Sequence, residues 1–304
     1  MKFEWSREKV FYQNLINALT LKSKIIQWSN IVKLSEIYQK KHELWLKILF
    51  ASFAISNEEV KSELYDMAGI EFRHLKWLSN MMREQGVEYD YEKSDLNIQK
   101  STNYNFFNYL IDEIKEIENE YDLKDNLFAR IKSDEDYFLQ KLRYFLAHSK
   151  FDAAITAFNR DRVYKGKKLS KKSTDALTIF LFEESYKEYE LILIYAYMQN
   201  YTNDIALYNV YQDLIDESMY HLKCFGNMQA QMGILAIPRT IIKSLYKRED
   251  IKQFFLDGID EERAAKEECI KLSQAVQDEE LSEFFDFINF QENYHIELMK
   301  KLLK

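Results

Sequence analysis

The sequence predicts an all-α protein built as two tandem four-helix bundles, each with one long crossover connection. The 304 residues include one Pro and six Gly, although strand-rich folds need turn residues often. Apolar residues recur at helical spacing over long stretches. The segment His74–Met81 (HLKWLSNM) returns 147 residues later as His221–Met228 (HLKCFGNM), which indicates an internal repeat.

The repeat extends along most of the chain, and four of the five histidines fall into two pairs that are 147 residues apart. Further matches occur in the same order at offsets of 147 or 148: Glu43–Leu44 with Glu190–Leu191, His148 with His295, and Phe106–Phe107 with Phe254–Phe255. The change of offset implies an insertion of one residue. We interpret the chain as a duplication, with copy one in residues 1–155 and copy two in residues 156–304.

The first helix pair of copy one is predicted from apolar spacing and capping residues. Apolar residues recur at helical spacing from about residue 31 to residue 55. Ser56-Asn57-Glu58-Glu59 then supplies an N-cap and an acidic first turn for a second helix that runs to about residue 82. A polar stretch over 84–104 is too long for a tight turn and is expected to be a crossover connection.

The second helix pair of copy one follows this crossover. A third helix is expected over about 106–132, and Ser133-Asp134-Glu135 is expected to cap a fourth that ends near residue 150. Copy two repeats the plan, and its expected helices cover about 174–200, 204–229, 250–276 and 279–303. The only proline, Pro238, lies in its crossover. Residues 7–28 are expected to form an additional amphipathic helix.

Composition excludes several classes of function. The formal net charge of −8 gives no basic field for nucleic acid. The one basic run, over 160–172, is interpreted as a solvated linker. The alternative is that it binds an anionic partner. Cys224 and Cys269 are too few for a disulfide framework or a thiolate cluster, and we expect them to pack as small apolar residues. The apolar run over 44–55 is too short to cross a bilayer, and the first residues do not read as a signal peptide, so a cytoplasmic location is expected.

Two Glu-x-x-His motifs carry the candidate chemistry, Glu71-Phe-Arg-His74 and Glu292-Asn-Tyr-His295. Residues i and i+3 share one helix face, so this carboxylate and imidazole can reach the same metal ion. Glu43 and Glu71 each lie 14 residues from residue 57, at the expected turn (57 − 43 and 71 − 57). Antiparallel helices therefore place these two carboxylates at the same height, and Glu261 and Glu292 flank the turn at 276–278 in the same way.

These residues resemble the ferritin-like di-iron carboxylate family, which includes rubrerythrin and bacterioferritin. The resemblance implies that helices one and three each give a Glu and that helices two and four each give Glu-x-x-His. In copy one it implies the metal ligands Glu43, Glu71, His74, Glu113 and His148. In copy two it implies Glu190, His221, Glu261, Glu292 and His295.

The chain departs from the family pattern at one position in each copy. Phe145 stands where the fourth-helix Glu of copy one belongs, and Ser218 stands where the second-helix Glu of copy two belongs. Glu71 and Glu292 are then the expected bridging carboxylates, and Glu217 is a neighbour that can complete the second site. Copy two is therefore expected to bind metal better. The chain contains no CxxC pair for a rubredoxin-type iron centre.

Some assignments stay open. Glu36 and Glu183 are also related by the repeat, and they are rival first-helix ligands to Glu43 and Glu190. Glu116 is a similar rival to Glu113. His42, whose repeat position holds Tyr189, is interpreted as a surface residue.

The resemblance implies iron, or iron with manganese, with at most two metal ions per bundle, in an oxidoreductase that reacts with dioxygen or peroxide. No nucleic acid or membrane partner is expected, and a homodimer is left open. Two alternatives remain, namely a non-catalytic bundle that sequesters iron and a helical scaffold whose metal sites have decayed.

Overall fold

The computed structural model describes residues 31–91, 103–148, 164, 166–234, 240–247 and 250–303. Helices make up all of the regular secondary structure in these residues, so the predicted all-α class is confirmed. The helix predicted over 7–28 lies outside the described residues, as do 92–102 of the first crossover and most of the expected boundary between the copies.

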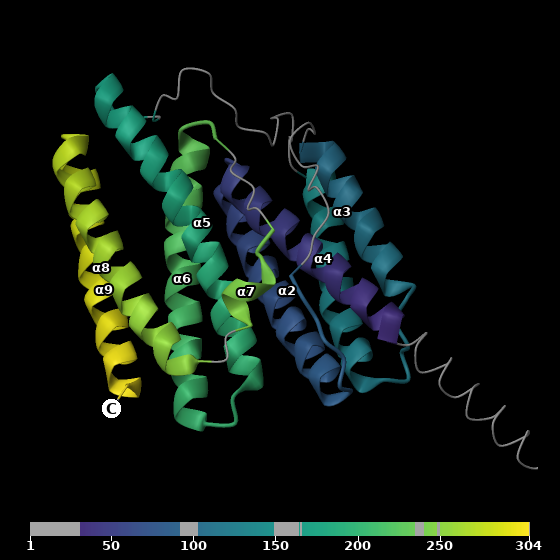
Figure 1. Ribbon diagram of the computed structural model, residues 1–304. Helices are drawn as coiled ribbons and strands as arrows, with labels where there is room; N and C mark the ends of the chain where they lie inside the picture. The colour runs from purple at the N-terminus through teal and green to yellow at the C-terminus, as the bar shows by residue number, and fades with distance from the viewer. Residues whose placement is uncertain are drawn as a thin grey trace, which may run out of the picture.

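The helices form two groups that lie side by side (Figure 1). The N-terminal group contains a first helix over 31–54, α2 (Glu58–Glu84), α3 (Asn103–Glu118) and α4 (Asn126–His148). The C-terminal group contains α5 (Lys171–Tyr201), α6 (Ile205–Gln231), α8 (Ile251–Val276) and α9 (Glu279–Leu302), with the short α7 (Lys243–Tyr246) packed against α5. Within this group α5 contacts α6 and α8, and α9 contacts α6 and α8.

The second helices of the two groups have the same length and the same caps. Both α2 and α6 contain 27 residues, and both their first and last residues are 147 apart. Asn57 accepts a hydrogen bond from the backbone N–H of Val60, and Asp204 caps α6 in the same way. Just after each helix ends, Gly86 and Gly233 adopt φ values of 68° and 73°, which an L side chain rarely tolerates.

The third helix of the N-terminal group is shorter than predicted. The expected helix over 106–132 is wrong, because α3 ends at Glu118 and α4 begins at Asn126. The side chains of Asp122 and Asp125 accept hydrogen bonds from backbone N–H groups two residues further on, which favours a turn. Ser133, Asp134 and Glu135, the predicted cap, therefore lie within α4.

The interface between the groups is apolar, and one core cluster includes residues of both. His42 lies in it with 0% exposure, so its interpretation as a surface residue is wrong. Its Nε2 lies 3.1 Å from the hydroxyl of Tyr189, the residue at its own repeat position. The two rings are stacked, with Trp45 stacked against both.

Contacts across this interface also occur in exchanged pairs. Lys76 donates a hydrogen bond to Gln212 at 2.6 Å. Lys223, which is 147 residues after Lys76, lies 3.9 Å from the ring centre of Tyr65, which is 147 residues before Gln212. Such an exchange is what a two-fold relation between the groups produces.

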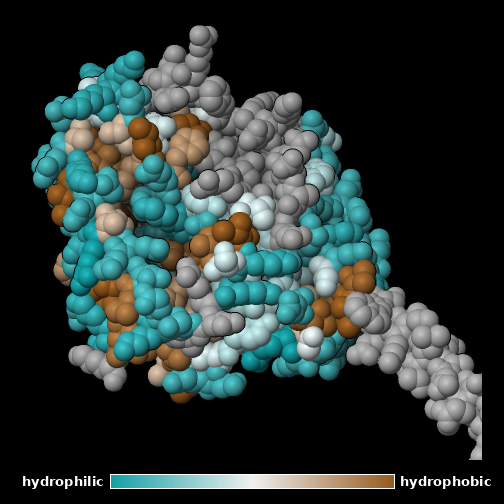
Figure 2. Space-filling model, viewed as in Figure 1, coloured by the Kyte–Doolittle hydropathy of each residue, from teal (hydrophilic) through white to brown (hydrophobic). Residues whose placement is uncertain are grey.

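The face of the molecule drawn in Figure 2 is largely hydrophilic. Figure 2 shows apolar patches separated by hydrophilic side chains on the face that carries α5, α7 and α8. In the part of the chain that the structure describes, no helix is both long and apolar enough to cross a membrane.

Gly226→Ala should destabilise the interface, because a Cβ at this position would lie 2.4 Å from the Phe53 ring. Phe53 is buried and packs edge-on against Phe50, so the ring has little room to move. We expect the free energy of unfolding to fall by about 1–3 kcal/mol in urea titrations.

Gly69→Ala is the matched control, since it lies in α2 and a Cβ there meets nothing within 4 Å. Alanine favours helix, so this variant should gain up to about 1 kcal/mol. Equal stability of the two variants would contradict the packing described for Phe53.

Candidate metal centre

Five buried side chains from four helices meet inside the C-terminal group. They form the C-terminal cluster: Glu188 of α5, His221 of α6, Glu262 of α8, and Glu292 and His295 of α9. Their exposed fractions range from 0% to 7%. Two sets of three have ligand atoms within 4.8 Å of one another, Glu188 with His221 and Glu292, and Glu262 with Glu292 and His295. Glu292 belongs to both sets.

Helical spacing explains why these residues face inward. On α9, Phe285, Ile288, Glu292 and His295 follow one another at intervals of three or four residues and are all buried. On α6, Leu214, Ser218, His221 and Phe225 follow the same pattern. The polar side chains of the cluster therefore continue the apolar stripes that hold the helices together.

His221 presents Nδ1 to the cluster and has a separate partner for Nε2. Its Nδ1 lies 2.8 Å from Glu188 Oε1 and 3.7 Å from Glu292 Oε1. Its Nε2 donates to Gln291 Oε1 at 3.2 Å. A hydrogen bond at one ring nitrogen orients the other toward a ligand position, as in metal sites with supported histidines.

His295 has the same arrangement. Its Nδ1 lies 3.0 Å from Glu292 Oε2 and 3.3 Å from Glu262 Oε1, and its Nε2 lies 2.6 Å from Glu217 Oε2. Glu217 is thus a support for the imidazole on the side away from the cluster. Glu217 was expected to complete the metal shell, but in the structure it contacts the outer nitrogen of His295 and is not one of the five clustered side chains, while Ser218 is buried beside it.

Glu292 lies between the two imidazoles, with one carboxylate oxygen directed at each. From this position Glu292 would be able to bridge two metal ions, which is the role expected for it. Burial, followed by the neighbouring Glu262 carboxylate, raises the pKa of Glu292 to about 7.

The protein charges in the cluster are its three carboxylates and the two imidazoles, whose pKa values are both raised. Burial alone lowers the pKa of His221, but the Glu188 and Glu292 carboxylates outweigh this and raise it to about 9. The pKa of His295 is raised too, because three carboxylates outweigh the effect of burial. Among the ion pairs of the described residues, Glu188, Glu262 and Glu292 pair with these imidazoles and with no Lys or Arg.

A buried carboxylate oxygen without a hydrogen bond also fits a cation at this place. In the described part of the chain, Glu188 Oε2 is buried and has no hydrogen-bond partner. Buried polar atoms are normally satisfied, and carboxylate oxygens with imidazole nitrogen are ligands suited to iron and manganese. The donor set therefore fits divalent metal ions.

The structure brings three of the five ligands expected in copy two into the cluster, His221, Glu292 and His295. The other two, Glu190 and Glu261, lie elsewhere, and Glu188 and Glu262 take their places. Glu190 is half-buried and Glu261 is exposed. Both line a cavity beside the cluster.

Helical register was the signal that could have identified the two missed residues. Glu188 follows Leu181, Glu184 and Ser185, which are buried on α5, at intervals of three to seven residues. Glu262 lies three residues after the buried Ile259 and seven before the buried Cys269. Counting residues from a turn sets the height of a side chain along the bundle, whereas the register sets the face on which it lies.

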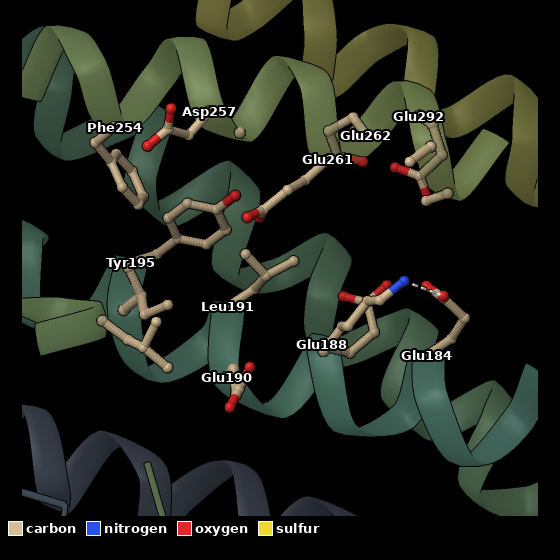
Figure 3. A pocket seen from close by; sticks show the side chains of 16 residues that line it. Glu184, Glu188, Glu190, Leu191, Tyr195, Phe254, Asp257, Glu261, Glu262 and Glu292 are labelled. Atoms are coloured by element: carbon tan, nitrogen blue, oxygen red, sulfur yellow. Dashed lines mark hydrogen bonds and ion pairs between the residues drawn. The ribbon is translucent and has the colours of Figure 1, made fainter. Parts of the chain in front are cut away.

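The cavity has a volume of about 330 Å³ and lies between α5 and α8. Figure 3 shows Glu188, Glu262 and Glu292 at one end of it, and Tyr195 and Phe254 at the other. Leu191 forms part of its apolar wall. A small molecule in this cavity would reach the carboxylates directly.

The corresponding place in the N-terminal group contains a lysine. We call Lys41, Glu71, His74, Asp134 and Glu135 the N-terminal cluster. Lys41 Nζ forms ion pairs with Glu71 and, at 2.8 Å, with Glu135, and all three side chains have 0% exposure. His74 is also fully buried, with Nδ1 3.5 Å from Glu71 Oε1 and Nε2 3.1 Å from Asp134 Oδ2.

Lys41 is a buried cation of the N-terminal cluster. Burial alone lowers the pKa of Lys41, but the carboxylates of Glu135 and Glu71 outweigh it and raise the pKa. Burial raises the pKa of Glu135 to about 7 in spite of Lys41, and Tyr121 donates to this carboxylate at 2.9 Å. Lys41 is thus held as an ammonium ion between two carboxylates.

The other ligands expected in copy one are not in this cluster. Glu113 pairs with Lys47, and Glu43 accepts a hydrogen bond from Gln39. His148 is exposed at the end of α4 and stacks on Tyr144. Because α3 is shorter than predicted, the offset of 147 residues does not apply within α4. Asp134 and Glu135 are the residues of α4 that face the cluster, and His148 lies at the exposed end of the helix.

Comparison of the chain with protein-family models, with curated proteins and with solved structures finds no match.

Lys41→Met should destabilise the protein strongly, because it leaves two carboxylates buried without their counter-ion. We expect a loss of about 3–5 kcal/mol in the free energy of unfolding at pH 7. Lys40→Met is the control, since Lys40 pairs with Glu116 and Glu120 at the surface and should contribute less than about 1 kcal/mol. Similar losses in both variants would refute the role given to Lys41.

Proposed function

We propose that this chain is a duplicated, ferritin-like di-metal carboxylate protein whose C-terminal cluster holds iron or manganese. One observation carries the proposal, namely the Glu292 carboxylate between the Nδ1 atoms of His221 and His295. Each of these histidines also has a carboxylate of its own, Glu188 or Glu262. This pattern resembles the di-metal sites of helical bundles, in which two helices each give a Glu and two give Glu-x-x-His, except that Ser218 replaces the Glu of α6.

Tandem duplication is supported by element bounds as well as by sequence. Besides α2 and α6, the first helix of the N-terminal group and α5 end 147 residues apart, at 54 and 201. The helices α3 and α8 begin 148 residues apart, at 103 and 251. The exchanged contacts of Lys76 and Lys223 agree with two copies related by a two-fold axis.

The proposed ligands divide into two sets with a shared member. Glu188 and His221 would hold one metal ion, Glu262 and His295 the other, and Glu292 would bridge them. Gln291 and Glu217 would orient the two imidazoles from behind. Three carboxylates carry three negative charges and two divalent ions carry four positive ones, so the site has room for a hydroxide or another anion.

An oxidoreductase that uses dioxygen or peroxide is the activity that this site supports best. Metal ions of this kind supply the electrons and open coordination positions that such chemistry requires. The cavity gives a small reactant access to the cluster. Tyr195 lies in the same cavity, and nearby carboxylates add to the effect of burial in raising its pKa, so it stays protonated.

Iron sequestration is a second candidate, favoured by the acidic lining of the cavity. Glu184, Glu190, Asp257 and Glu261 all line it, whereas Lys187 is the only basic residue among the lining side chains described. Such a lining attracts divalent cations toward the cluster. Both candidate functions use the same metal site, but only the oxidoreductase would oxidise Fe²⁺ repeatedly.

The purified protein should bind up to two equivalents of Fe²⁺ or Mn²⁺, and His221→Ala, His295→Ala and Glu292→Gln should each abolish at least one equivalent. Loss of one ligand weakens binding because the remaining donors leave the ion incompletely coordinated. His148→Ala and Glu190→Gln are matched controls outside the cluster and should bind as the wild type does. Elemental analysis and calorimetric titration measure this, and full binding by the His221 and His295 variants would refute the site.

Repeated oxidation of bound Fe²⁺ distinguishes an oxidoreductase from a protein that sequesters iron. Stopped-flow absorption after mixing the Fe²⁺-loaded protein with dioxygen or peroxide should show rapid oxidation that repeats over several cycles with added reductant. Glu292→Gln should slow it at least tenfold, because the bridge is removed. A single oxidation followed by retention of ferric iron would favour sequestration.

A further inference from the structure

The two clusters are built on one plan. His74 and His221 lie 147 residues apart, and each Nε2 contacts a side-chain oxygen from the last helix of its group. That oxygen comes from Asp134 in α4 and from Gln291 in α9. The next residue along each helix, Glu135 or Glu292, is a buried carboxylate. Both pairs are 157 residues apart rather than 147, because α3 has ten residues fewer than α8 and the longer connection over 119–125 makes up for only part of this difference.

The same register shows what replaces the C-terminal ligands in the N-terminal group. Lys41 stands at the repeat position of Glu188, and Ile114 stands at that of Glu262. Phe138 stands where His295 would be, and its ring centre lies 6.5 Å from that of His74, compared with 5.8 Å between His221 and His295. An acidic ligand has thus been replaced by a basic side chain, and two further ligands by apolar ones.

The charge reversal at position 41 removes the need for a metal ion. The ammonium of Lys41 contacts both Glu71 and Glu135 and is as deeply buried as they are. A divalent ion placed between the same two carboxylates would meet the ammonium group at close range, and repulsion between like charges would exclude it.

We propose that Lys41 is a built-in counter-ion that takes the place of a metal ion, so that the N-terminal cluster is a blocked metal site. Glu71, His74 and Glu135 remain as potential ligands, and Asp134 still supports the imidazole. The N-terminal group then serves as a metal-free partner that packs against the C-terminal group. The comparison rests on the function proposed for the C-terminal cluster, but the block itself concerns residues of the N-terminal group alone.

Lys41→Glu should open the blocked site. The experiment uses the full chain with His221→Ala and His295→Ala, so that binding by the C-terminal cluster is silenced whether or not it holds metal in the wild type. In this background we expect Lys41→Glu to bind about one equivalent of Co²⁺, seen as new visible absorption bands, and of Mn²⁺, seen as loss of the free-ion resonance signal. The parent with Lys41 should bind none at this site.

Lys41→Gln is the matched control, because it removes the ammonium group without adding a carboxylate. Its affinity for Co²⁺ should be at least about tenfold lower than that of Lys41→Glu. A folded Lys41→Glu variant that binds no more Co²⁺ than the parent would overturn the proposal. Binding by Lys41→Glu supports it even if the wild-type C-terminal cluster proves to hold no metal.

Crowding of three carboxylates in Lys41→Glu will lower the stability of the metal-free form. If this variant is unfolded without metal, the same Co²⁺ titration is followed by circular dichroism. Binding to the folded state should then restore the helical signal. An unfolded variant that stays unfolded at saturating Co²⁺ also overturns the proposal.

Discussion

Buried carboxylates at the centre of each helix group require a positive charge in contact with them, and both halves of the molecule are arranged around this requirement. Isolated charges in a core cost many kcal/mol, so they are found only with a partner. In the N-terminal group Lys41 supplies that partner from within the chain. In the C-terminal group the imidazoles of His221 and His295 are the protein's contribution, and the proposed metal ions complete it.

The imidazoles of His221 and His295 are oriented by residues outside the C-terminal cluster. Gln291 and Glu217 contact the outer nitrogens of His221 and His295, and Asp134 does the same for His74. These contacts fix the ring orientation, so the inner nitrogen faces the carboxylates. The N-terminal group has the same support around His74, although Lys41, Ile114 and Phe138 stand at the positions of three residues of the C-terminal cluster.

The interface between the groups explains why the first helix was difficult to interpret. Residues 41–53 and 192–196 are buried without interruption, because each helix packs against its own group on one side and the other group on the opposite side. The first helix therefore has no solvent-facing stripe over 41–53 to mark its register, and sequence reasoning chose Glu43 and overlooked Lys41. Exposed Phe182, Glu183 and Lys187 do mark the register around Glu188, and counting from the turn led to Glu190 instead.

The sequence by itself determined the helical class, the 147-residue offset, the ends of the first two helices of each half, and His221, Glu292 and His295 as neighbours. Those features depend on local spacing and capping, which a single chain displays directly. Tertiary structure alone decided that His148 lies at the surface and that position 41 carries the counter-ion. Contacts between distant helices fix these features, and repeat spacing misleads wherever one helix has changed length.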